Sequence, residues 1–179
     1  MSDTKRVVIF RSKTGFTQRY ARWIAEDLHC DAIPLEKFTP QGLKEYDIVI
    51  FGGGIYASRI NGIKFIKDNL SQLTGKKIIV FATGAAAPIP EEIERIKKGN
   101  IPGGEDIAFF YFQSGLNYEK MQSGDRLLMG GLKFYLKSRW NKSDTDKGAL
   151  AAIQSSYDYA DRMNIKPLVD YANTVSIVK

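Results

Sequence analysis

Short apolar runs alternate with longer amphipathic segments along the first two thirds of the chain. Runs rich in Val, Ile and Phe predict five buried strands, at 6–10, 31–35, 47–51, 77–82 and 107–112. Helical spacing of the apolar residues between them predicts helices that begin at Thr17 and that span 62–70 and 90–98. Because strands that alternate with helices pair in parallel through right-handed crossovers, we expect a doubly wound five-stranded α/β sheet with helices on both faces.

The C-terminal third has a less regular pattern. Residues 125–140 predict an extra amphipathic helix before the last one, with apolar side chains four residues apart at Leu128, Leu132, Leu136 and Trp140. The last helix is expected at 147–164, and Lys166-Pro167 is expected to end it. Since no repeat, low-complexity tract or linker interrupts the chain, residues 1–179 are expected to form a single domain.

The loop after the first strand carries the clearest candidate chemistry. In open parallel sheets, ligands bind beyond the carboxyl ends of the strands, where the winding direction reverses. The sequence from Ser12 to Thr17 places three hydroxyls and one glycine between a predicted strand and a predicted helix. A helix start offers unpaired N–H groups and the positive end of the helix dipole, so this loop predicts a phosphate-binding site. The alternative is an ordinary loop in which a threonine caps the helix.

Residues 10–17, FRSKTGFT, resemble the phosphate loop of the flavodoxin family, whose pattern is [ST]-x-T-G-x-T. The order of the elements and the glycine-rich end of the third strand match as well, so the resemblance covers about residues 6–165. It implies a flavodoxin-like fold that binds FMN, with the phosphate held by Ser12, Thr14, Gly15 and Thr17 and by backbone groups of Lys13 and Phe16. By the same resemblance, three further loops contact the cofactor through Gly53, Gly54, Ile55, Tyr56, Ala57, Thr83, Gly84, Ala85, Ala86, Gly115, Leu116, Asn117 and Tyr118.

The later part of the chain is similar to a narrower family. Residues 114–118 (SGLNY), the basic aromatic helix and residues 144–146 (DTD) resemble the bacterial oxygen-independent, menaquinone-dependent protoporphyrinogen oxidases. Residues 83–104 depart from that family. Two redox functions therefore stay open: a flavodoxin-like electron carrier, and a flavin-dependent dehydrogenase with a quinone acceptor. A third hypothesis is an FMN-binding module without redox chemistry. No side chain stands out as a catalytic acid or base.

Two loops bear on how the flavin ring would be covered. Tyr56 could stack on the ring, or it could be a solvent-facing loop tyrosine. Residues 85–87 are all alanine, where flavodoxins commonly carry an aromatic side chain. We therefore expect one face of the ring to be open to a substrate or a redox partner.

The sequence holds few of the residues that other kinds of site require. The sequence Gly52, Gly54, Ala57 fits G-x-G-x-x-A, but it follows the third strand, and Lys76 and Lys77 stand where the ribose-binding acid is expected. The sole histidine is His29 and the sole cysteine is Cys30, which leaves no Ser-His-Asp site, no histidine-rich metal site and no internal disulfide.

The net charge of +6 and the pI of about 9.3 favour anionic partners. Residues 120–142 hold six basic residues and one acid, so the helix 125–140 could contact an anionic membrane surface, or it could pack on the domain with a solvated basic face. The expected partners are a redox protein or a quinone or tetrapyrrole substrate; nucleic acid is not expected. Without a signal-peptide pattern or a long apolar run, the expected location is the cytoplasm, with peripheral membrane contact as an option.

Overall fold

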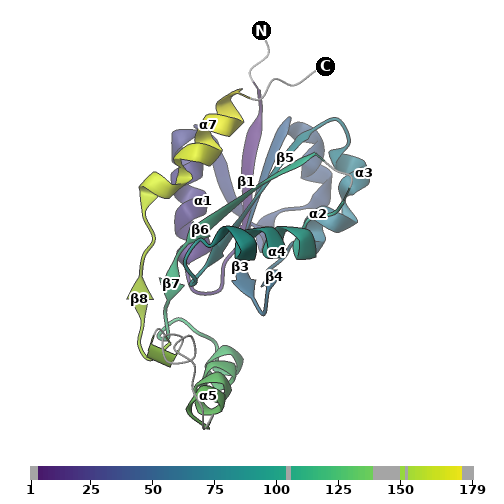
Figure 1. Cartoon of the computed structure of the whole chain (residues 1–179). Helices are drawn as coiled ribbons and strands as arrows, with labels where there is room; N and C mark the ends of the chain where they lie inside the picture. Colours follow the sequence, from purple (N-terminus) through teal and green to yellow (C-terminus); the bar gives the residue numbers. More distant parts are fainter. Residues whose placement is uncertain (1–3, 104–105, 139–149, 152, 175–179) are drawn as a thin grey trace.

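A parallel sheet of five strands forms the centre of this computed structural model, which describes residues 4–103, 106–138, 150–151 and 153–174 (Figure 1). The strand order is β2-β1-β3-β5-β6. Their bounds are β1 Arg6–Arg11, β2 Asp31–Pro34, β3 Ile48–Tyr56, β5 Lys77–Gly84 and β6 Ile107–Gln113. The predicted doubly wound five-stranded sheet is thus confirmed. The winding reverses between β1 and β3, where Phe10 aligns with Gly52 and Arg11 with Gly53.

Helices cover both faces of the sheet, as the apolar strands require. One face carries α1 (Phe16–Asp27), the 3-10 turn η3 (Arg162–Ile165) and α7 (Lys166–Thr174), which bury Tyr20, Ile24 and Leu168 against β1, β3 and β5. The other face carries apolar residues of five short elements. These elements are η1 (Leu35–Lys37), η2 (Pro40–Glu45), α2 (Lys64–Asp68), α3 (Leu70–Leu73) and α4 (Pro90–Asn100).

Three short strands lie at the carboxyl end of the sheet. β4 (Arg59–Ile60) pairs antiparallel with the end of β3, and β7 (Gly115–Leu116) pairs antiparallel with β8 (Tyr157–Asp158). The third strand is therefore longer than the apolar run at 47–51 indicates. Its glycine-rich extension continues the sheet because β5 and β4 supply hydrogen-bonding partners on both sides.

The prediction for the last helix is wrong. Residues 150–151 are helical, but the chain at 153–161 is extended or turned, and the last helix begins at Lys166. Pro167 stands in its first turn, where a missing N–H costs nothing and the fixed φ favours helix. Lys166-Pro167 therefore starts this helix rather than ending one. The part of the prediction at 147–149 and 152 lies outside the described residues.

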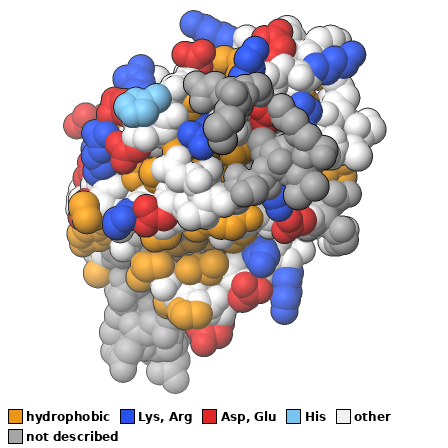
Figure 2. All heavy atoms as spheres, turned by 90° about the horizontal axis from the view of Figure 1, so that it is seen from above, with side chains coloured by type: hydrophobic (Ala, Val, Ile, Leu, Met, Phe, Trp, Pro, Cys, Tyr) orange, Lys and Arg blue, Asp and Glu red, His pale blue; other side chains and the backbone are white. Residues whose placement is uncertain are grey.

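The extra helix before the last one is present as α5 (Ser123–Ser138), and its predicted end at 139–140 lies outside the described residues. Figure 1 shows it beyond the carboxyl ends of the strands, at the end of the molecule opposite to the termini. Seen from the end with the termini, acidic and basic side chains are interspersed around the rim (Figure 2). Among the described residues, no helix is long and apolar enough to cross a membrane.

The buried side chain of Asn100, at the end of α4, holds the β3–β4 hairpin in place. Its Oδ1 accepts a hydrogen bond from the Ile60 N–H at 2.8 Å, and its Nδ2 donates to the carbonyls of Ser58 at 2.9 Å and Ile96 at 2.8 Å. The hairpin turns through Ala57 and Ser58, whose φ values of 47° and 63° are left-handed. Because such values are unfavourable for residues other than glycine, the surrounding contacts must stabilise this turn.

We expect Asn100→Ala to lower the free energy of unfolding by about 2–3 kcal/mol, because it leaves a buried N–H and two carbonyls without their partner. Urea unfolding followed by circular dichroism measures this. Asn69→Ala is the control, since Asn69 bonds only within its own helical segment, to Phe65 and Gln72. A loss for Asn100→Ala no larger than that of the control would show that the hairpin does not depend on this side chain.

Candidate functional site

The loop between β1 and α1 ends in an uncapped helix start. Gly15 occupies the N-cap position of α1 with a left-handed φ of 96°, and no side chain forms a capping hydrogen bond there. The Ser12 hydroxyl accepts a hydrogen bond from the Gly15 N–H at 3.1 Å, which folds the loop back on itself. The N–H groups of the first turn therefore point out of the helix without a side-chain acceptor, which is the arrangement that binds anions. The alternative prediction of a threonine cap is wrong.

Thr17 connects this loop to the neighbouring strand of the site. Its side chain is buried on the first turn of α1, and its Oγ1 lies 2.8 Å from the Oγ1 of Thr83, at the end of β5. Gly54 lies between them, since a Cβ placed there would be 3.4 Å from Thr17 Oγ1 and 3.8 Å from Thr83 Oγ1. The start of α1 and the ends of β3 and β5 thus meet at one point, next to the β1–β3 position where the winding of the sheet reverses.

A cavity of about 340 Å³ opens at this point, and we call it the switch-point cavity. It brings together most of the predicted site residues from all four loops. These are Lys13, Thr14, Phe16, Thr17, Gly54, Ile55, Tyr56, Ala57, Thr83, Gly84, Ala85, Gly115, Leu116 and Asn117.

The remaining predicted residues do not line this cavity. Ser12 accepts the hydrogen bond from Gly15 within the loop, Gly15 lines a second hollow described below, and Gly53 packs against Ile60 and Asn61 of the hairpin. Ala86 offers its carbonyl to the hydroxyl of Tyr111. Tyr118 turns away, because its hydroxyl donates to the Ile153 carbonyl and Lys133 lies 4.3 Å from its ring centroid.

Sequence reasoning missed one wall of the cavity. Besides the predicted loops, it is lined by Asn61, Ser114, Met121, Asp125, Leu128, Met129 and Leu132. Four of these side chains lie on α5, which the apolar spacing predicted as a helix but none of whose residues was assigned to the site. Leu128 and Leu132 belong to the apolar residues spaced four apart that the sequence predicted on this helix. That spacing was the signal that could have pointed to this wall of the cavity.

Lys13 joins the phosphate loop to α5. Its Nζ lies 3.1 Å from Asp125 Oδ1 and 4.2 Å from the centroid of the Tyr56 ring. The Asp125 side chain is only 12% exposed, so this ion pair is more shielded than the surface pairs of the molecule. It holds α5 over the switch-point cavity, between the phosphate loop and the hairpin.

Two tyrosines support the alanine loop after β5. The Tyr111 hydroxyl donates to the Ala86 carbonyl at 2.7 Å, and the Tyr157 hydroxyl donates to the Ala85 carbonyl at 3.3 Å. Burial raises the pKa of Tyr111 to about 12, so its hydroxyl keeps its proton at neutral pH. The loop is therefore anchored by its backbone, and of its three alanines Ala85 lines the cavity.

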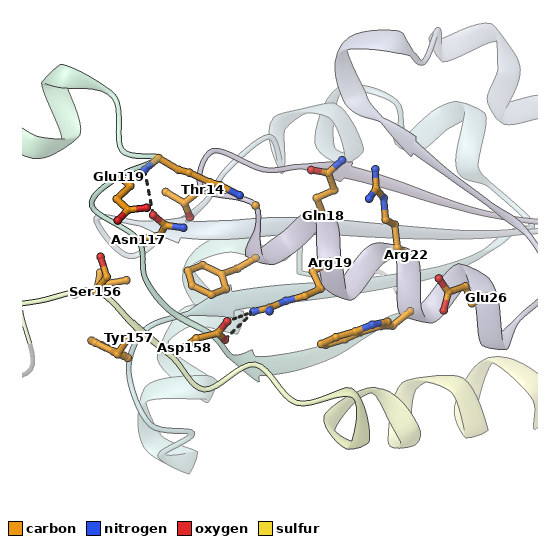
Figure 3. Close-up of a pocket in the computed structure, with 15 residues that line it drawn as sticks. Thr14, Gln18, Arg19, Arg22, Glu26, Asn117, Glu119, Ser156, Tyr157 and Asp158 are labelled. Atoms are coloured by element: carbon orange, nitrogen blue, oxygen red, sulfur yellow. Dashed lines mark hydrogen bonds and ion pairs between the residues drawn. The ribbon is translucent and has the colours of Figure 1, made fainter.

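A second, wider hollow lies on the outer side of the phosphate loop, and we call it the outer cleft. It measures about 650 Å³ and shares Thr14, Phe16, Leu116 and Asn117 with the switch-point cavity. Figure 3 shows Arg19 turned toward Asp158, with which it forms two hydrogen bonds of 2.7 Å, while Gln18 and Arg22 point the other way from α1. The Arg19 guanidinium, by donating these bonds, lowers the pKa of Asp158 against the opposing effect of burial.

Other chemistries find no site among the described residues. Burial raises the pKa of the Cys30 thiol to about 11, which leaves it protonated and unreactive at neutral pH. His29 is exposed at the end of α1, with a left-handed φ of 51°, as expected for a residue that follows a helix. In the part of the chain that the structure describes, no three His, Cys, Asp or Glu side chains cluster closely enough to hold a metal ion.

Comparisons with known proteins agree with this architecture. The chain superposes on the crystal structure of a flavodoxin, WrbA-like protein from Agrobacterium tumefaciens with a TM-score of 0.50 and 19% identity, over 69% of this chain and 88% of that one. It also superposes on the two-electron reduced flavodoxin of Megasphaera elsdenii with a TM-score of 0.47 and 14% identity, over 66% of this chain and 89% of that one. The first of these likenesses concerns the fold.

A sequence relative is an uncharacterized protein of Methanocaldococcus jannaschii, 35% identical over 69 residues. The match covers 37% of this chain and 45% of the relative, so the chain spans less than half of the relative's length. A flavodoxin domain model matches residues 7–146, which include all five strands of the parallel sheet and the whole switch-point cavity. The chain belongs to the flavodoxin domain family.

Proposed function

We propose that the protein binds FMN in the switch-point cavity and works as a flavodoxin-like electron-transfer protein. One observation carries the proposal: the uncapped amino end of α1 opens beside a mainly apolar cavity between the ends of β3 and β5. This combination suits a ligand with a phosphate at one end and a flat, largely apolar ring at the other. Membership of the flavodoxin domain family supports the same choice.

The donor set fits the cofactor's phosphate. The first turn of α1 supplies N–H groups and the positive end of the helix dipole, and Thr14 and Thr17 line the cavity beside it. The left-handed Gly15 lets the backbone close around an anion. FMN would therefore be anchored mainly by hydrogen bonds to its phosphate.

The rest of the cavity fits the flavin ring. Its volume of about 340 Å³ lies within the roughly 300–1,000 Å³ usual for small-molecule sites. Ile55, Leu128, Met129 and Leu132 supply apolar surface, and Tyr56 supplies an aromatic face. FMN, when bound, provides the redox chemistry, while these residues orient the ring and limit its contact with water.

Electron transfer is favoured over chemistry on a bound substrate. Lys13, Asp125 and Tyr56 are the titratable residues among the described lining of the cavity, and Lys13 and Asp125 pair with each other. No other acid or base stands ready to move a substrate proton there. The resemblance to protoporphyrinogen oxidase gains no support from the family model or the relatives reported above, so a dehydrogenase with a quinone acceptor is not favoured.

The outer face of α5 is the proposed docking surface, and its partner is an anionic lipid membrane. Leu127 and Phe134 point away from the domain with 79% and 74% of their surface exposed. The basic residues Arg126, Lys133 and Lys137 lie along one flank of the same helix, where Arg126 and Lys133 also donate to carbonyls of the neighbouring loops. The helix's one described acid, Asp125, is paired with Lys13. An apolar face with a basic flank is the pattern of helices that lie in a membrane interface.

We expect the purified protein to be yellow, and mass spectrometry after denaturation to identify FMN rather than FAD or NAD. Gly15→Val should weaken FMN binding at least tenfold, since a branched side chain is strained at a φ of 96°. Thr14→Ala should weaken it about five- to tenfold by removing one hydroxyl donor. Calorimetric titration of apoprotein with FMN measures both effects.

Gly75→Val is the matched control for Gly15→Val. Gly75 also has a positive φ, 76°, but it lies at the amino end of β5, away from the cavity. Gly75→Val should lower the free energy of unfolding without changing the affinity for FMN. The same affinity in Gly15→Val as in the wild type would remove this loop from the site.

Leu127→Ser/Phe134→Ser should abolish most of the binding to vesicles that contain phosphatidylglycerol. Burying two such side chains contributes about 1.5–3 kcal/mol each, so the loss should be well over tenfold. Flotation at low salt measures it, with vesicles of phosphatidylcholine alone as the uncharged comparison. Met163→Ser is the control, because Met163 is 69% exposed outside α5, in η3. A wild-type protein that floats with neither vesicle would show that this helix face serves another partner.

A further inference from the structure

The lysine within the phosphate loop, Lys13, forms its contacts outside that loop. Lys13 lies in the middle of the loop, but its ammonium group bonds to Asp125 on α5 and lies over the Tyr56 ring. It is therefore held at the side of the cavity where the ring is proposed to bind. Arg19, one turn into α1, is likewise engaged by Asp158. Neither cation is free to neutralise a phosphate at the start of α1.

A second lysine lies against the loop from the other direction. The Nζ of Lys120 lies 3.6 Å from the position that a Cβ would take at Gly15, and its Cδ lies 4.0 Å from the same point. Among the described residues, no carboxylate pairs with this ammonium group. Lys120 thus places an uncommitted positive charge directly over the residue that shapes the anion-binding loop.

The backbone that carries Lys120 is fixed. Its N–H donates to Asn117 Oδ1 at 3.1 Å, and the neighbouring Tyr118 N–H donates to the Ser156 hydroxyl at 3.0 Å. Asn117 itself lines both the switch-point cavity and the outer cleft (Figure 3). The loop after β7 is therefore held at the wall between the two hollows, beside Thr14.

We propose that Lys120 is a phosphate-binding residue that gives this protein its preference for a phosphorylated flavin. The inference rests on the proposed FMN site and names a residue outside the loop from 12 to 17. The ammonium group would donate a charge-assisted hydrogen bond to the phosphate from the side opposite to the N–H groups of α1. The segment before α5 thus contributes to cofactor choice.

The experiment compares FMN with riboflavin, which lacks the phosphate, in calorimetric titrations of the apoprotein at two salt concentrations. Lys120→Ala should raise the Kd for FMN about tenfold and leave the Kd for riboflavin unchanged. The salt dependence of FMN binding should become weaker as well, because one ionic contact is lost. Lys120→Arg should stay within about threefold of the wild type. Lys98→Ala, an exposed lysine on α4, is the control for the same change in net charge.

Each outcome separates this inference from the proposed function. A wild-type protein that binds neither flavin would overturn the FMN site itself. Wild-type binding of FMN that is unaffected in Lys120→Ala, or that weakens no more than in Lys98→Ala, would leave the FMN site standing and overturn the role of Lys120. An equal loss for FMN and riboflavin would also overturn it, because Lys120 would then be shaping the cavity rather than contacting phosphate.

Discussion

β3 has no room for side chains at Gly52 and Gly53, and the site depends on that constraint. A Cβ at Gly52 would lie 2.0 Å from the ring of Phe81, and one at Gly53 would lie 2.4 Å from the Asn61 carbonyl oxygen. Because Gly52 and Gly53 carry no side chains, the Phe81 ring can pack against one face of β3, and the return strand β4 can pair closely with β3. The strand then presents Gly54 to the cavity between Thr17 and Thr83. A larger residue at these positions would push apart the elements that the site requires to meet.

The site has a rigid half and an adaptable half. The rigid half is built on β1, β3, β5 and α1, whose apolar side chains are fully buried on both faces of the sheet. The adaptable half is α5, of which Leu136 is the one residue buried among those described. A few polar contacts hold it: the partly shielded Lys13–Asp125 pair, and hydrogen bonds from Arg126 to the Tyr118 and Glu119 carbonyls. Such contacts are individually modest, so α5 can move more easily than the strands that it covers.

α5 contributes both to the wall of the cavity and to an exposed apolar surface. Its inner side closes the cavity with Leu128, Met129 and Leu132, and its outer side exposes Leu127 and Phe134. A partner that touches the outer side is therefore one helix diameter from the cavity. Lys120, in the loop before α5, lies against Gly15 of the phosphate loop. In return, Lys13 of the phosphate loop pairs with Asp125 of α5. The inserted segment is in this way part of the site rather than an addition to it.

The sequence by itself determined the sheet, three of its flanking helices in outline, and the loop from 12 to 17. The strands and helices follow from the periodicity of the apolar residues. The loop follows from local chemistry, because hydroxyls and a glycine before a helix start are typical of a phosphate-binding loop. Local patterns could not decide the last helix, because Pro167 is compatible with the start of one helix and with the end of another. Tyr118 likewise looked like a cofactor contact, but its hydroxyl bonds to Ile153. Only the tertiary structure showed which side chains of α5, Asp125 among them, line the cavity, and that Lys120 lies against Gly15. Their roles come from contacts between residues roughly a hundred positions apart, such as Lys13 with Asp125, and no local spacing specifies a contact of that range.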